Sequence, residues 1–222
     1  MTNLNRKIYF ALIVAVTSVN AGAMAQTCSP PQGFVNQPPP ALAAPNRLAA
    51  HTEEITVNRP LAIVVSTAEK TDIKDAIHKA GDLPWVIGEY PLNSIPFGKP
   101  GARRLVCLSD NSTLEEQVLE VEASKSFNRF RYMVWNYTSK QARPIEYGIG
   151  EFRHTEIDPS HTHIVWTYSF KLKDNEFPGY LGALGRTLFH WMFLDKDYAA
   201  MMRATLEAGK AQAEKRPSGE GN

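Results

Sequence analysis

Cysteine is scarce in this sequence, with only Cys28 and Cys107 among 222 residues. Small exported domains that depend on disulfides carry many more, so the chain is not a disulfide scaffold. A single disulfide bond between Cys28 and Cys107 is one possibility. The alternative is a buried Cys107 thiol in a strand and an unpaired Cys28 in a flexible segment, because spacing alone does not place two Cα atoms within bonding reach.

The chain also lacks an excess of either charge and the common catalytic and metal motifs. It has 24 basic and 23 acidic side chains, whereas nucleic-acid-binding domains usually show a basic excess or stripe, so no nucleic-acid partner is expected. Neither HExxH, CxxC nor GxSxG occurs, and we expect no metal and no cofactor. Gly148-Ile149-Gly150 lacks the third glycine of a dinucleotide loop and precedes no helix, so it does not predict phosphate binding.

No apolar run reaches the roughly 20 residues that span a bilayer. The longest, residues 8–19, follows Arg6 and Lys7 and precedes Ala23-Met24-Ala25. A basic start, an apolar middle and small residues at the exit are typical of a secretory signal peptide, rather than of a permanent anchor or a buried strand. We therefore predict a signal peptide over residues 1–25 and an exported protein, periplasmic or secreted.

Proline marks the segment after the signal peptide. Residues 26–50 contain Pro30-Pro31 and Pro38-Pro39-Pro40, a composition that favours extended, solvated backbone, as in a tether or an ordered wrap. We expect one domain over residues 51–213 and a disordered polar tail over 214–222.

The domain shows strands in its middle and helices toward its ends. Residues 60–80 and those from Pro178 to about 213 have helical patterns, with an irregularity expected at Asp195, which resembles an N-cap. Four prolines make residues 81–100 irregular. Strands are expected at residues 51–58, 103–109, 113–123, 128–138, 145–156 and 163–172. This order predicts an α+β fold, with a curved antiparallel sheet of about six strands around a long C-terminal helix.

Large side chains alternate along two of these strands. In strand 163–172 one face carries Ile164, Trp166, Tyr168, Phe170 and Leu172, so this face is expected to be buried. Strand 128–138 is bulky on both faces, with Met133, Trp135 and Tyr137 on one and Phe130, Tyr132 and Val134 on the other. A sheet that packs wide rings against one helix tends to leave an interior cavity.

The order of elements resembles that of the START-like superfamily. Gly101-Ala102-Arg103-Arg104 opens a strand, Glu116 comes early in the next, and residues 147–150 and Trp166-Thr167-Tyr168 lie where the pattern expects strands. Within the superfamily the sequence is most similar to the polyketide cyclase/dehydrase and lipid-transport (SRPBCC) proteins. The resemblance implies a helix-grip fold over residues 51–213. It does not imply an activity, because members bind lipids, hormones and secondary metabolites and only some are enzymes.

Arg104 and Glu116 are the most suggestive polar pair. A hairpin turning through residues 110–112 places both on one otherwise apolar face. They then form either a structural ion pair or a group that orients a ligand, and a register change of one residue would separate them. His154, His161 and His163 suggest a metal site only weakly, and a solvated surface is the better interpretation for His161 and His163.

These observations leave three functional hypotheses. The first is an exported carrier of a hydrophobic or aromatic small molecule. Its expected ligand-binding residues are Trp135, Tyr137, Tyr147, Trp166, Tyr168 and Phe189. The second is a cyclase- or dehydratase-like enzyme with Glu116 as acid or base and Arg104 as stabiliser. The third is a protein-interaction module of the cell envelope. Residues 180–194 also suggest transient contact with a membrane. The sequence does not indicate an oligomeric state.

Overall fold

The computed structural model describes residues 27–77 and 81–215. Within them one antiparallel sheet has the strand order β1-β7-β6-β5-β4-β3-β2. Its strands are β1 (Ala49–Val57), β2 (Val86–Pro91), β3 (Arg103–Leu108), β4 (Thr113–Ala123), β5 (Phe127–Trp135), β6 (Ile145–Asp158) and β7 (His161–Leu172). The predicted signal peptide lies outside the described residues.

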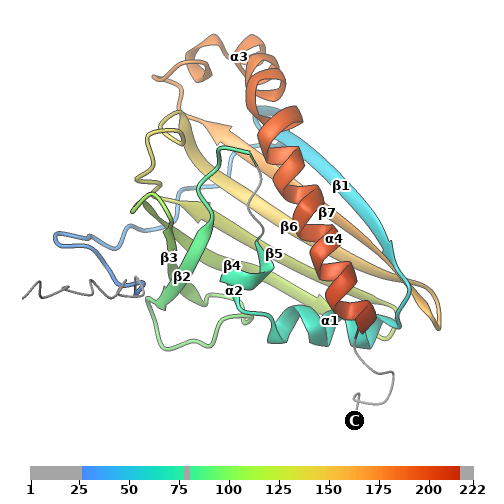
Figure 1. Cartoon of the computed structure of the whole chain (residues 1–222). Coiled ribbons are helices and arrows are strands. Elements are labelled where there is room, and N and C mark those ends of the chain that lie inside the picture. Colours follow the sequence, from blue (N-terminus) through green and yellow to red (C-terminus); the bar gives the residue numbers. More distant parts are fainter. Residues whose placement is uncertain (1–26, 78–80, 216–222) are drawn as a thin grey trace, which may run out of the picture.

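The helices lie on one face of this sheet (Figure 1). They are α1 (Leu61–Lys70), α2 (Ile73–Ala76), α3 (Ala183–Phe189) and α4 (Ala199–Lys215), with the single turn η2 (Gly179–Leu181). Another single turn, η1 (Pro45–Arg47), precedes β1. A π-helical stretch, η3 (His190–Tyr198), joins α3 to α4. The α4 helix crosses the sheet diagonally and packs on β1 and α1. The predicted α+β architecture, with a curved sheet and a long C-terminal helix, is confirmed.

The sheet has seven strands, one more than expected. The additional strand is β2, which lies within residues 81–100, predicted to be irregular. It is an edge strand that ends at Pro91, a position where a missing N–H costs no ladder hydrogen bond. The prolines around β2 therefore concealed a real strand.

Three helical boundaries also differ from expectation. The helix predicted over residues 60–80 ends at Lys70, and Asp72 caps a second short helix by accepting a hydrogen bond from the Lys74 N–H. Asp195 is not an N-cap, but the helix is irregular there as expected, because Asp195 lies inside the π-helical stretch η3, through which the helical chain continues. The helix α4 extends to Lys215, so the first two residues of the predicted tail are helical. No helix of the described residues is long and apolar enough to cross a membrane.

The alternation predicted for strand 163–172 is confirmed. All five of its apolar positions face the helices and are buried, and the core around them includes Phe189, Leu194, Met202 and Leu206. We call this helix-covered side of the sheet its inner face and the opposite side its outer face.

Residues 27–48, which we call the strap, run along the outer face. Ala43 and Leu48 pack on an outer cluster of Met133, Trp135, Tyr147 and Ile149. The Ala43 N–H donates to the Tyr147 hydroxyl at 2.6 Å, and the Trp135 indole N–H donates to the Gln37 carbonyl at 3.3 Å. The proline-rich composition therefore serves an extended segment whose polar groups bond to the sheet.

Candidate ligand-binding site

An apolar cavity of about 980 Å³ lies between the inner face and the helices. Pockets for small ligands usually measure about 300–1,000 Å³, so this cavity is large enough for a polycyclic molecule. Most of the aromatic rings that line it come from β5 and the residues just after it, from β6, from β7 and from the C-terminal helical segment. These are Phe130, Tyr132, Tyr137, Phe152, Trp166, Tyr168, Phe170, Phe193 and Tyr198, and Trp85 and Phe97 complete the set.

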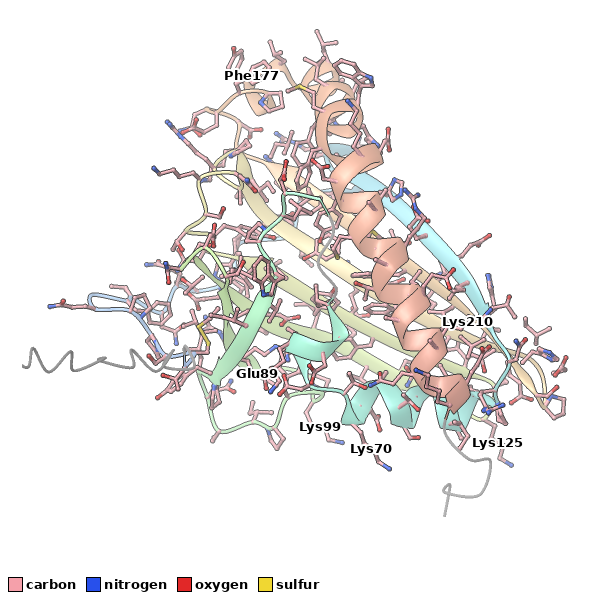
Figure 2. The ribbon with its side chains drawn as sticks, in the orientation of Figure 1. Lys70, Glu89, Lys99, Lys125, Phe177 and Lys210 are labelled. Atoms are coloured by element: carbon pink, nitrogen blue, oxygen red, sulfur yellow. A yellow bond between two sulfur atoms is a disulfide. The ribbon has the colours of Figure 1, made fainter. Side chains whose placement is uncertain are left out.

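The exposed lining residues mark the mouth of the cavity. They include Lys70 of α1, Asp72 at the start of α2, Lys99 of the β2–β3 loop and Gln212 of α4. Lys70, Lys99 and Glu89 lie at the same end of the molecule (Figure 2). The mouth therefore carries charges of both signs, whereas the interior is mostly aromatic.

Two glycines of β6 lie beneath aromatic rings that line the cavity. A Cβ atom at Gly150 would lie 2.1 Å from the Tyr132 ring, and one at Gly148 would lie 2.6 Å from the Tyr168 ring. Both rings thus lie close against the backbone of β6, which only glycine permits at this distance. The Gly148-Ile149-Gly150 motif creates room for aromatic rings.

Arg104 and Glu116 are cross-strand partners on the inner face, as predicted for the first two hypotheses. Arg104 Nε donates to Glu116 Oε2 at 2.5 Å, and the same guanidinium bonds Glu89 and lies 3.4 Å from the centre of the Phe97 ring. Burial alone would lower the pKa of Arg104, but Glu116 and Glu89 raise it by more, so the arginine stays charged. This charged end of the cavity carries one cation and two carboxylates.

Four tyrosine hydroxyls lie in the same interior. Burial raises the pKa of Tyr132, Tyr137, Tyr168 and Tyr198, and the charge of Glu116 adds to this for Tyr132. At neutral pH these hydroxyls are therefore protonated and can donate hydrogen bonds. The Tyr137 hydroxyl and the Trp166 indole N–H are buried and interact with the side chains of Tyr168 and Tyr132, respectively.

His154 lies on the inner face, next to Phe152, whose ring stacks on Trp166 with centres 4.6 Å apart. Burial lowers its pKa to about 4, so the imidazole is neutral at neutral pH. His163 pairs in register with Thr155, the neighbour of His154, and so lies on the other face. The three histidines do not converge, and no group of metal-binding side chains occurs in residues 27–77 and 81–215.

Three of the six predicted ligand-binding residues line the cavity, namely Tyr137, Trp166 and Tyr168. The placement of Trp135 and Tyr147 was wrong, because both belong to the outer cluster beneath the strap. Phe189 is buried against Phe170 but does not line the cavity. Ligand contact by the three lining residues stays a prediction.

The directions in which the side chains of β5 point explain why Trp135 was wrongly assigned to the cavity. Tyr132 and Val134 face inward, whereas Trp135 faces outward, and Tyr137 returns to the inner side because Asn136 adopts a positive φ of 53°. The alternating glycines were the missed signal, since Tyr132 pairs with Gly150 and Val134 with Gly148.

A second buried ion pair lies beneath the strap. Arg103 donates to Glu115 at 2.5 Å, and Glu115 also accepts from the Gln37 N–H and the Asn136 side chain, both at 2.8 Å. The Glu115 side chain is fully buried. Because donors from both the strap and the sheet satisfy it, this pair holds the strap in place.

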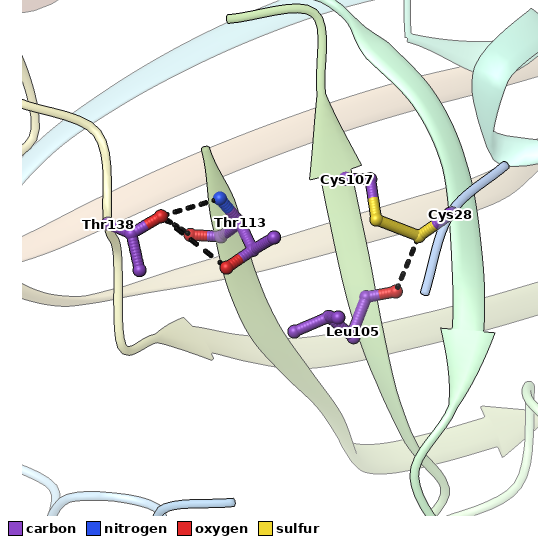
Figure 3. Close-up of a disulfide and its surroundings, with 5 residues drawn as sticks. All are labelled: Cys28, Leu105, Cys107, Thr113 and Thr138. Carbon is purple, nitrogen blue, oxygen red and sulfur yellow. Dashed lines mark hydrogen bonds between the residues drawn. A yellow bond between two sulfur atoms is a disulfide. The ribbon is translucent and has the colours of Figure 1, made fainter. Parts of the chain in front are cut away.

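A disulfide fixes the start of the strap. Cys28 and Cys107 are bonded, with Cα atoms 5.5 Å apart, and Cys28 also lies near the Leu105 carbonyl of β3 (Figure 3). A Cβ at Gly88 would be only 3.1 Å from Cys28, so the bridge lies close against β2 as well. Of the two possibilities that the sequence allowed for Cys28 and Cys107, the structure therefore has the disulfide.

Comparison with known proteins rests on structure alone, since no family model and no curated protein matches the sequence. The ZhuI aromatase/cyclase from Streptomyces sp. R1128 aligns with a TM-score of 0.56 and 17% identity, over 78% of this chain and 98% of its own. Ara h 8.0201 aligns with a TM-score of 0.52 and 14% identity, over 76% of this chain and 99% of its own. The di-domain protein StfQ of the steffimycin biosynthetic pathway aligns with a TM-score of 0.54 and 14% identity, over 77% of this chain and 52% of its own. With its curved antiparallel sheet around a long C-terminal helix, the chain shares the helix-grip fold of these structures.

Proposed function

We propose that the protein is an exported binding protein or carrier for a hydrophobic or aromatic small molecule. The observation that carries this proposal is the aromatic cavity of about 980 Å³ with polar groups inside it. The protonated hydroxyls of Tyr132, Tyr168 and Tyr198 line this cavity and could donate to a carbonyl or hydroxyl oxygen of a ligand. The open interior also supports a small-molecule role over that of an envelope protein-interaction module.

The polar groups suggest how such a ligand lies. Its ring system packs between Tyr132, Trp166 and Tyr168, and its oxygens point to the tyrosine hydroxyls. A free carboxylate is disfavoured at the charged end, because Arg104 already bonds Glu116 and Glu89. We therefore expect neutral aromatic ligands to bind better than anionic ones.

An enzymatic alternative has one observation in its favour, the acid–cation pair inside the cavity. ZhuI is an aromatase/cyclase of the same fold, and Glu116 with Arg104 would serve a cyclase- or dehydratase-like reaction. The carrier is favoured because Glu116 Oε2 and Arg104 Nε bond each other. In an enzyme Glu116→Gln should abolish turnover, whereas in a carrier it should change only ligand preference.

Native mass spectrometry of the purified protein tests the carrier. We expect a small-molecule adduct, and binding of an apolar fluorescent dye that Trp166→Ala weakens. Trp135→Ala is the matched control, because Trp135 is equally buried but lies on the outer face. Equal dye binding by both variants, with no adduct, would contradict a ligand site in this cavity.

Export rests on the sequence of residues 1–25 and is supported by the disulfide, which persists in an oxidising compartment. N-terminal sequencing of the protein from the cell envelope or medium should read Gln26 first. A chain that still begins at Met1 there would contradict cleavage.

A further inference from the structure

One end of the molecule exposes an unusual number of large apolar side chains. Of the thirteen that are exposed among the described residues, six fall between positions 177 and 192, each 36–65% exposed. They are Phe177, Tyr180, Leu181, Leu184, Trp191 and Met192, and we call them the apolar tip. Phe177 marks this end, opposite Lys70 and Lys99 at the cavity mouth (Figure 2).

The backbone beneath the apolar tip is tightly packed. A Cβ atom at Gly179 would lie 2.1 Å from the Lys173 carbonyl oxygen, and one at Gly185 would lie 1.9 Å from the Pro178 carbonyl oxygen. These two glycines hold η2 and α3 against the preceding loop. The apolar side chains are therefore presented by a packed segment and not by a frayed end.

The side of this segment that faces the sheet packs into the core. Phe189 and Leu194 are buried in the core, and Phe193 contacts Phe170. The segment thus buries apolar side chains on one side while it exposes others on its opposite side. Exposed apolar groups in such a contiguous set usually mark a surface that contacts something apolar.

Charge around the apolar tip favours an anionic surface. Residues 177–194 contain no acidic side chain but include Arg186 and His190. Lys196 lies 4.8 Å from the centre of the Trp191 ring. Three of the flanking acids contact basic side chains: Asp174 contacts Lys171 at 2.9 Å, Glu176 contacts Arg143 at 3.1 Å, and Asp195 contacts His51 and His190, both at 3.3 Å.

We propose that the apolar tip docks onto the surface of a lipid bilayer that contains anionic lipids. Tryptophan and tyrosine suit the boundary between headgroups and acyl chains, and leucine, methionine and phenylalanine suit the layer just below. The basic side chains would meet lipid headgroups. The tip also projects from one end of the sheet (Figure 1), a shape suited to shallow insertion. This inference is independent of what occupies the cavity.

Vesicle sedimentation with the purified protein tests the proposal. We expect partition onto vesicles of phosphatidylcholine with phosphatidylglycerol, accompanied by a blue shift of tryptophan emission. Leu184→Asp and Trp191→Asp should each lower the partition coefficient at least about tenfold, because a charge replaces a side chain that enters the apolar layer. Arg186→Gln should lower it about fivefold, and only when phosphatidylglycerol is present.

Ile157→Asp is the matched control, since Ile157 is 57% exposed but lies on the β6–β7 hairpin, away from the tip. It should bind vesicles as the wild type does. Equal loss in all variants, or no partition of the wild type, would overturn the proposal. A concentration-dependent dimer that Leu184→Asp dissociates, without vesicle binding, would also overturn it and identify the tip as an interface between two copies.

Discussion

At the scale of residues, two neighbouring ion pairs lie on opposite faces of the sheet. On β3 and β4, Arg104 pairs directly with Glu116, and Arg103 reaches Glu115 diagonally. Because side chains alternate, one ion pair forms on each face of the sheet. Glu115 accepts three hydrogen bonds beneath the strap and is fully buried. Glu116 borders the cavity and is partly compensated by an arginine that it shares with Glu89. The outer pair thus holds the strap on the sheet, whereas the inner pair lies in the wall of the cavity.

Removal of Arg104 should be costly. Arg104→Met leaves the buried carboxylate of Glu116 without its cation, which we expect to lower the free energy of unfolding by about 3–5 kcal/mol. Glu89→Gln is the control, with an expected loss of about 0–1 kcal/mol because Glu89 is 41% exposed. Urea titration measures both. An Arg104→Met variant as stable as the wild type would mean that cavity water hydrates Glu116.

At the scale of elements, β6 shapes the cavity and the strap seals the opposite face. The two inward glycines of β6 let Tyr132 and Tyr168 lie against its backbone. On the outer face Trp135 and Tyr147 are covered by the strap rather than by a helix. Each face of the sheet therefore has its own cover, and the strap is an integral part of the domain.

A methyl group on the inner side of β6 should disturb the cavity. In Gly150→Ala the new Cβ would lie 2.1 Å from the Tyr132 ring, so the ring must move into the cavity. We expect the unfolding free energy to fall by about 1–3 kcal/mol and dye binding to weaken. Gly209→Ala on α4 meets no atom within 4 Å and should instead stabilise by about 1 kcal/mol. Equal unfolding midpoints for the two variants would refute the tight ring packing.

The disulfide should account for much of the stability of the strap. It closes a loop between residues 79 positions apart, for which the chain-entropy model gives about 4 kcal/mol. Reduction, or Cys28→Ser with Cys107→Ser, should lower the unfolding free energy by about that amount and expose Trp135 to a fluorescence quencher. Unfolded, unreduced protein should show no thiol on labelling. Two labelled cysteines would disprove the bridge.

At the scale of the whole molecule, sequence patterns predicted the layers better than the site. Periodicity at positions 164–172 identified the inner face of β7 correctly, because the strand is buried on one side only. Strand β5 is covered on both faces, by the helices and by the strap, so bulky residues alternate on both and the pattern does not indicate which face borders the cavity. The strap also depends on distant partners, such as Gln37 with Glu115, which no local pattern reveals.

Acid should destabilise the whole fold through His154. The ordinary histidine pKa is 6.5, whereas in the folded state burial lowers the pKa of His154 to about 4. Below pH 6.5 the His154 imidazole therefore binds a proton in the unfolded chain but stays neutral in the folded chain. Between pH 6.5 and 4 this group should cost about 3 kcal/mol of unfolding free energy. His154→Leu should flatten that part of the pH profile. Parallel profiles for variant and wild type would rule out a buried neutral imidazole.

The position of the single disulfide has a consequence for biogenesis. In a chain exported from its N-terminus, Cys28 leaves the secretion channel first and meets no partner thiol until β3 has followed, since no other cysteine exists in the sequence. Only one intramolecular pairing is available, so a thiol oxidase suffices and no disulfide isomerase is needed to correct it. If the chain is exported as proposed, the strap can lock only after Cys107 of β3, about halfway along the chain, has emerged.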